Sequence, residues 1–165
     1  MLDQSGLSEI YEFNNRYWVI QKSYQRWPDN EGPTERVALT GDLPINCSAE
    51  QIGELCISAL NNFNQMKPQF SPWQLKELRQ LFCSWVGAKG WPSFYKNSRY
   101  VWVKHDSKMH SINIIPVDNC STSPVESAIN EKIKSVSSEA EITKIGQAIF
   151  EAFNYATSHP ERKKR

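Results

Sequence analysis

Two stretches of the chain share one amphipathic pattern, and this repeat limits the folds that the chain can adopt. Residues 48–63, SAEQIGELCISALNNF, carry apolar side chains at alternating spacings of three and four, which predicts a helix with one buried face. Residues 141–156, EITKIGQAIFEAFNYA, repeat this pattern, with an Ile-Gly pair at the corresponding place. Because Gly53 and Gly146 weaken a helix, we expect each glycine to permit a close approach to a neighbouring helix or sheet.

Side chains that cap helix N-termini stand at the start of both stretches. Ser48 and Gln51 have the spacing of a capping box, and Ser138 with Glu141 repeats it before the second stretch. Residues 71–86 begin with Ser-Pro and continue with a broad apolar face, which predicts a third helix.

The segments between the helices alternate apolar and polar residues, as half-buried strands do. The hairpin dipeptide Asn14-Asn15 joins the first two such segments, and 106–108 form a turn in the second strand-rich block, which begins at residue 91. Residues 25–34, QRWPDNEGPT, are expected to be irregular. Strands are predicted at 7–13, 17–24, 36–45, 100–103, 111–115 and 128–136.

The helices and strands together predict an α+β fold. We expect an antiparallel or mixed sheet of about five to seven strands with three main helices packed on it, including two related strand-helix units. A chain of 165 residues suits one domain, which we place at residues 1–160. The basic residues 161–165 are expected to form a disordered tail.

Charge is distributed unevenly along the chain. Residues 1–66 contain nine acidic and four basic side chains, whereas residues 67–165 contain nine acidic and fifteen basic ones. This asymmetry indicates either a charged partner for one half or a mixed solvated surface with a basic tail.

The residue types that catalyse reactions or bind metals form no recognisable motif in this sequence. His105, Asp106 and His110 flank one turn, but further ligands are missing, and an exposed hairpin end is the simpler interpretation. The four cysteines are widely spaced, which argues against a disulfide framework. We therefore expect no enzymatic activity, no cofactor and no metal.

The chain lacks the marks of secretion or membrane insertion. Its N-terminal residues have neither a basic n-region nor an apolar h-region, and no apolar run reaches the roughly 20 residues of a membrane span. We expect a cytoplasmic protein that makes no membrane contact.

Aromatic and basic residues are interleaved between Trp91 and His105. The segment WPSFYKNSRYVWVKH could stack bases above Lys96 and Arg99 in a single-stranded nucleic-acid-binding module, with Trp102 in the stack. Ordinary strand alternation explains the same pattern. This module is the alternative function, and our main interpretation involves no direct nucleic-acid binding.

Two groups of motifs resemble one family. The first comprises Leu43-Pro44, Ser48, Ile52-Gly53 and Ala59-Leu60. The second comprises Tyr95-Lys96 and Ile114-Ile115-Pro116. Over roughly residues 36–156 the chain resembles the CdiI immunity proteins of bacterial contact-dependent growth inhibition (CDI) systems.

This resemblance implies an inhibitor that occludes the active site of its target. Its partner would be the cognate C-terminal toxin domain of the exoprotein CdiA, and such toxins are often nucleases, including tRNA-cleaving ones. The inhibitor would act in the cytosol as a monomer or small homo-oligomer. The resemblance transfers no binding residues, because each family member matches its own toxin.

The residues themselves indicate where a basic toxin would bind. The acidic, aromatic segment at residues 25–34 would complement the basic cleft in which a toxin binds nucleic acid. Charge complementarity of this kind raises association rate and specificity. The hypothesised toxin-binding residues are Trp27, Asp29, Glu31 and Glu35, with Glu12, Asp42 and Glu50 in second rank.

Overall fold

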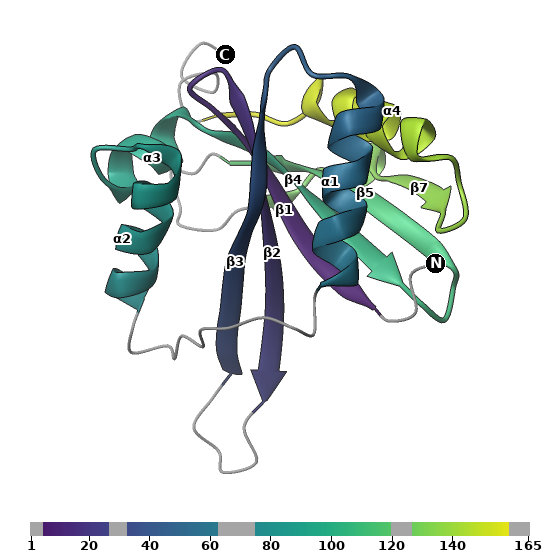
Figure 1. The fold of residues 1–165 in the computed structure, drawn as a ribbon, viewed down its shortest axis with the longest axis horizontal. Helices are drawn as coiled ribbons and strands as arrows, with labels where there is room; N and C mark the ends of the chain where they lie inside the picture. The colour runs from purple at the N-terminus through teal and green to yellow at the C-terminus, as the bar shows by residue number, and fades with distance from the viewer. Residues whose placement is uncertain (1–4, 27–32, 63–74, 120–126, 159–165) are drawn as a thin grey trace.

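The centre of the computed structural model is a seven-stranded sheet (Figure 1). The structure describes residues 5–26, 33–62, 75–119 and 127–158. All named strands pair antiparallel in the order β3-β2-β1-β4-β5-β6, and β7 also pairs with β5. The strands are β1 (Gly6–Phe13), β2 (Arg16–Arg26), β3 (Pro33–Pro44), β4 (Arg99–Asp106), β5 (Ser111–Asp118), β6 (Ser127–Ala128) and β7 (Lys134–Ser137).

Helices cover both faces of this sheet, so the predicted α+β architecture is confirmed (Figure 1). The described α-helices are α1 (Ala49–Asn61), α2 (Leu75–Val86), α3 (Trp91–Asn97) and α4 (Ile142–Phe153). Helix α3 corrects our assignment of this segment to a strand-rich block. Pro92 stands in its first turn, where a missing N–H costs little, and seven residues are too few for a clear helical period.

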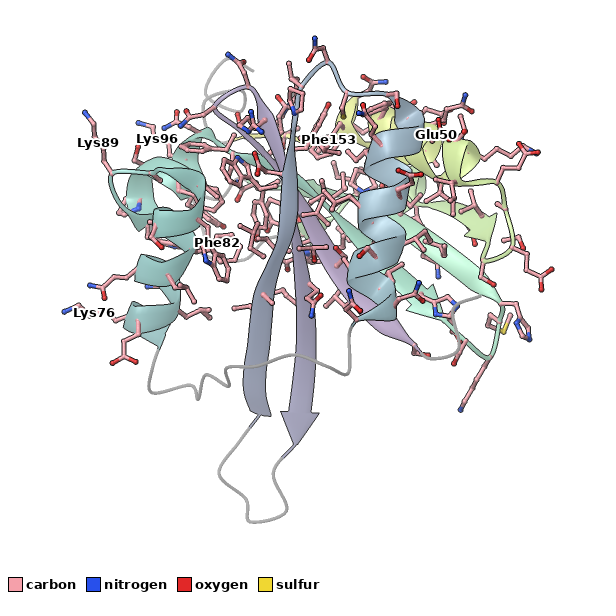
Figure 2. All side chains as sticks on the ribbon, viewed as in Figure 1. Glu50, Lys76, Phe82, Lys89, Lys96 and Phe153 are labelled. Carbon is pink, nitrogen blue, oxygen red and sulfur yellow. The ribbon has the colours of Figure 1, made fainter. Side chains whose placement is uncertain are left out.

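Strand alternation divides the apolar side chains between two cores. In β4, Val101 and Val103 face α1 and α4, whereas Tyr100 and Trp102 face α2 and α3. The α1–α4 core is mainly aliphatic, and the α2–α3 core is mainly aromatic. Phe153 and Phe82, both labelled in Figure 2, belong to these two cores respectively. Because both faces of the sheet are covered, strand side chains that point to either face are buried.

The repeat seen in the sequence extends over six of the seven described strands, all but β6. Strands β1, β2 and β3 precede α1, and strands β4, β5 and β7 precede α4. One offset of 93 residues relates Gly6 to Arg99 and Ala49 to Ile142, the first residues of matching elements. The protein thus consists of two β-β-β-α units, larger than the predicted strand-helix units. The segment containing α2 and α3 lies between them.

The two repeated helices cross at the glycines of their Ile-Gly pairs. A Cβ atom on Gly146 would lie 1.7 Å from the carbonyl oxygen of Ala49, and one on Gly53 would lie 2.4 Å from that of Ile142. Only glycine allows these backbones to come so close. The expected close approach at both glycines is therefore confirmed, and the neighbour in each case is the other helix.

Of the short motifs predicted at turns and helix starts, the hairpin turn and the first capping box formed, and the second capping box did not. Asn14 and Asn15 both adopt positive φ, 52° and 57°, as a tight hairpin turn requires. Ser48 forms its capping box, with its backbone N–H donating to the Gln51 side chain at 2.9 Å. The second box is wrong: α4 has Glu141 as its N-cap residue, which makes no side-chain capping bond.

Several strand boundaries also differ from expectation. The β2–β3 ladder extends to the pair Arg26↔Pro33, so part of the segment predicted to be irregular is strand. Proline is tolerated there because it occupies the first residue of its strand. The strand predicted at 128–136 is instead divided by a 3-10 turn, Asn130–Lys132, between β6 and β7. Two other predictions cannot be compared with the structure. Residues 71–74, the start of the third predicted helix, lie outside the described residues, and so does the whole basic tail, 161–165.

Candidate functional site

The long β2–β3 hairpin projects beyond the helices at one end of the molecule (Figure 1). Glu35 lies near the end of its ladder, where its backbone pairs with Tyr24. The other first-rank toxin-binding residues, Trp27, Asp29 and Glu31, lie outside the described residues, in the stretch that connects the two strands. In the sequence, the hypothesised contact segment is thus bounded by two long paired strands.

The second-rank residues Glu12 and Asp42 occupy the opposite end of the hairpin, beside the Asn14-Asn15 turn. Seven residues separate Glu35 from Asp42 along β3, which corresponds to about 23 Å of strand. Glu50 is exposed in the first turn of α1 (Figure 2). Among the described acids of the hypothesis, the fold therefore does not bring Glu35 together with Glu12 and Asp42.

Glu12 and Asp42 are also neutralised by partners within the protein. Glu12 accepts a hydrogen bond from the Arg99 guanidinium at 2.7 Å, in a half-buried ion pair. Arg99 donates a second bond to the carbonyl oxygen of Phe153 at 3.4 Å, which links β4 to the end of α4. Asp42 pairs with Arg16. These contacts give both carboxylates a structural role and reduce their net negative field.

The Glu12–Arg99 pair shapes the electrostatics around Tyr17. The pKa of Tyr17 is raised to about 12, chiefly by burial and then by the Glu12 carboxylate and Cys47, while the Arg99 cation opposes them. Because both burial and nearby negative charge disfavour a phenolate, Tyr17 is a neutral core residue rather than a base.

Histidines and cysteines do not assemble into a site within the described residues. His105 is buried in β4, whereas His110 is exposed in the following turn. No group of three or more His, Cys, Asp or Glu side chains in this part of the chain could hold a metal ion. Cys47, Cys56 and Cys83 are free and buried, and burial raises the pKa of the Cys56 thiol to about 12. Such thiols are unreactive packing residues.

The interleaved aromatic and basic segment does not form one surface. Trp102 packs against the α2–α3 core, with the Lys104 ammonium 5.2 Å from its ring centroid, and Arg99 is held by Glu12. Lys96 is exposed on α3, a separate element from β4. The predicted nucleic-acid surface of Lys96, Arg99 and Trp102 is therefore divided between the two faces of the sheet and a helix.

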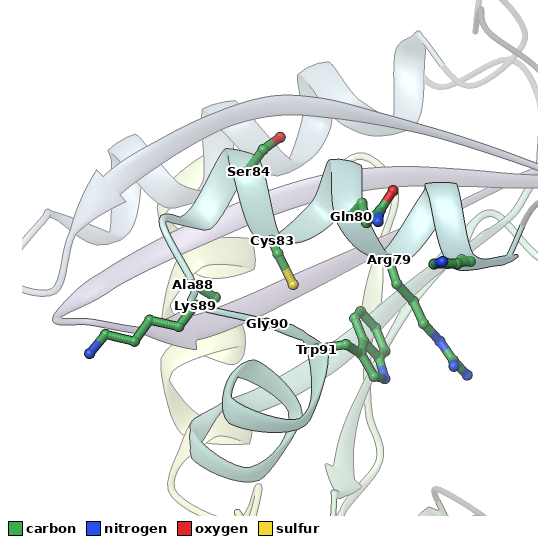
Figure 3. A pocket seen from close by; sticks show the side chains of 9 residues that line it. Arg79, Gln80, Cys83, Ser84, Ala88, Lys89, Gly90 and Trp91 are labelled. Atoms are coloured by element: carbon green, nitrogen blue, oxygen red, sulfur yellow. The ribbon is translucent and has the colours of Figure 1, made fainter.

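A groove between α2 and α3 was not predicted from the sequence (Figure 3). It has a volume of 540 Å³, and most of its side chains come from the exposed flank of α2 and the loop that leads to α3. The spacing of Lys76 and Arg79 on one helix flank is the signal that could have revealed it. Its lining residues are Lys76, Arg79, Gln80, Cys83, Ser84, Ala88, Lys89, Gly90 and Trp91.

Comparisons with known proteins identify similar folds. A protein of unknown function, NMB0488 from Neisseria meningitidis, has a TM-score of 0.67 at 16% identity, covering 95% of this chain and 98% of that chain. A chain in the CdiA-CT/CdiI toxin and immunity complex from Yersinia pseudotuberculosis has a TM-score of 0.61 at 14% identity, covering 93% and 98% respectively. No family model and no curated protein sequence matches the chain. At these identities the likeness establishes a shared fold.

The described helices give no indication of a membrane span. None of them is both long enough and apolar enough to cross a bilayer.

Proposed function

We propose that this protein is an immunity protein that binds and neutralises the C-terminal toxin domain of a cognate CdiA exoprotein. The observation that carries this proposal is the fold likeness to a chain of a toxin and immunity complex, which spans nearly the full length of both chains. The sequence motifs that resemble CdiI proteins point to the same function.

We propose that the toxin is a nuclease and that this protein inhibits it in the cytosol by occluding its active site. A nuclease needs a positively charged cleft to bind its substrate backbone. Asp29, Glu31 and Glu35, on or beside the projecting hairpin, would complement such a cleft, and Trp27 would supply an aromatic anchor. Strong complexes depend on a few such anchors rather than on contact area alone.

The function can be tested by co-expressing this protein with the C-terminal ~200 residues encoded by the neighbouring upstream reading frame. A fragment of that length is typical of one domain. We expect that fragment to be toxic alone, and to be harmless and co-purify with this protein at one-to-one stoichiometry. A non-toxic fragment, or a toxic fragment that neither binds nor is neutralised, would refute the proposal.

Charge reversal then tests the contact surface. We expect Asp29→Lys combined with Glu31→Lys to weaken toxin binding at least tenfold without lowering the melting temperature. The matched control combines Glu54→Lys with Glu139→Lys, two exposed acids on α1 and beside α4, and it should bind within twofold of wild type. Equal binding by both double variants would exclude the hairpin while leaving the immunity function intact.

A further inference from the structure

The α2–α3 groove has a strongly one-sided charge. Three cationic side chains, Lys76, Arg79 and Lys89, line it, and none of its described lining residues carries a carboxylate (Figure 3). Among described residues 76–98, Glu77 is the single acid against four bases. Lys76 and Lys89 extend outward from the body in Figure 2. Cations that line one groove without acidic neighbours produce a positive potential that attracts an anionic ligand.

Within the described residues, ion pairs neutralise some cations of the protein but none of those in the groove. Arg16, Lys22, Arg99 and Lys134 each form an ion pair with a carboxylate. No ion pair in the described part of the chain involves the three cations of the groove. Their charges remain available to a ligand.

One wall of the groove provides a flat surface. The Arg79 guanidinium carbon lies 5.4 Å from the centroid of the Trp91 ring, and the two side chains lie alongside each other in Figure 3. Behind the ring, Phe82 and Phe94 contact Trp91 with centroid distances of 5.9 and 5.6 Å. The aromatic core thus holds the indole in place. Arginine planes and indole rings are the side chains on which nucleic-acid bases stack.

We propose that this groove binds single-stranded nucleic acid, with a base against the Arg79–Trp91 pair and phosphates at Lys76 and Lys89. The two lysines stand near opposite ends of α2, whose 12 residues span about 18 Å. An oligonucleotide can reach both lysines, whereas a mononucleotide can contact one. An acidic peptide would satisfy the charges but would leave the flat surface without a stacking partner, so the observations favour nucleic acid.

This site is independent of the proposed immunity function. The groove lies on α2 and α3, which cover one face of the sheet, whereas the hypothesised toxin contact is the projecting β2–β3 hairpin (Figure 1). Groove variants should therefore still co-purify with the toxin domain, so failure of one proposal leaves the other standing.

Fluorescence anisotropy of a labelled 12-nucleotide single-stranded RNA, titrated with the full chain, tests the site. Two phosphate contacts predict a slope of about −1.4 for the logarithm of the binding constant against that of salt concentration. We expect Lys76→Glu combined with Lys89→Glu to weaken binding at least tenfold. The matched control, Lys108→Glu with Lys144→Glu, removes equal charge from exposed positions elsewhere and should stay within twofold of wild type.

Two further measurements separate stacking from charge. Arg79→Lys keeps the cation but removes the planar group, so we expect at least fivefold weaker binding with an unchanged melting temperature. Unlabelled AMP should compete far more weakly than the unlabelled RNA. Absence of binding by wild type at 50 mM salt, equal affinity of the two double variants, or competition by hexaglutamate as effective as that of RNA would each overturn the proposal.

Discussion

Replacing Gly146 with alanine tests the helix crossing that joins the two β-β-β-α units. The new Cβ would lie 1.7 Å from the Ala49 carbonyl oxygen, whereas ordinary contact begins at 3.4 Å, so the helices must separate by more than an ångström. A gap of about 0.5–1 Å already loses a quarter to a half of the dispersion attraction. The obstructing atom belongs to the α1 backbone and cannot rotate away, so we take the upper part of the overpacking range, about 3 kcal/mol.

The gain in helix propensity from glycine to alanine offsets about 1 kcal/mol of that loss. We therefore expect Gly146→Ala to lower the free energy of unfolding by about 2 kcal/mol. Gly53→Ala should cost less, because its nearest backbone obstacle, the Ile142 carbonyl oxygen, is farther away at 2.4 Å.

Urea titration followed by circular dichroism measures the difference. With a slope of about 2 kcal/mol per molar urea, the midpoint of Gly146→Ala should fall by about 1 M. Gln147→Ala is the matched control, because this neighbouring position on α4 is exposed and should remain within about 0.5 kcal/mol of wild type. A Gly146→Ala protein as stable as the Gln147→Ala control would refute the argument that glycine is required by the crossing.

Three further predictions use the same urea assay. Ser48→Ala removes the α1 capping box and should cost about 1 kcal/mol, and an unchanged midpoint would contradict a role for the cap. Burial and the Glu12 carboxylate raise the pKa of Tyr17 to about 12, so folding favours its neutral form. Its stabilising contribution should be constant below pH 10 and decrease between pH 10 and 12, as the unfolded tyrosine ionises first. The stability difference between wild type and Tyr17→Phe should show this decrease, and a difference independent of pH would exclude the effect. A double-mutant cycle with Glu12→Gln and Arg99→Gln should give a coupling free energy of about 0.5–1 kcal/mol for the half-buried pair, and a value near zero would show that the pair contributes nothing measurable.

Short-range signals were sufficient for the elements whose residues act locally. Asn14-Asn15 predicted a hairpin because few other residues tolerate positive φ at both positions. Ser48 and Gln51 predicted the start of α1 because their side chains bond to backbone groups within one turn. Ser138 and Glu141 carry the same signal, but the chain between β7 and α4 forms a turn in which Ser137 accepts a bond from Glu139, and the helix begins later.

Candidate binding surfaces were harder to predict than local elements, because a sequence does not show which charged side chains pair with each other in the fold. Glu12 and Asp42 have the composition of an acidic contact patch, yet both are matched by arginines that the sheet brings beside them. Conversely, Lys76 and Arg79 are ordinary surface residues until the fold places Trp91 next to them.

Local sequence patterns were enough to predict the two amphipathic helices, the hairpin turn and the alternation that assigns strand residues to opposite faces, since each depends on periodicity or on contacts within a few residues. Three features became visible in the folded protein alone: Gly53 and Gly146 meet across one helix crossing, α2 and α3 cover the second face, and a cationic groove opens between them. These features arise from contacts between residues far apart in the chain, and such contacts are set by the packing of whole elements rather than by local pattern.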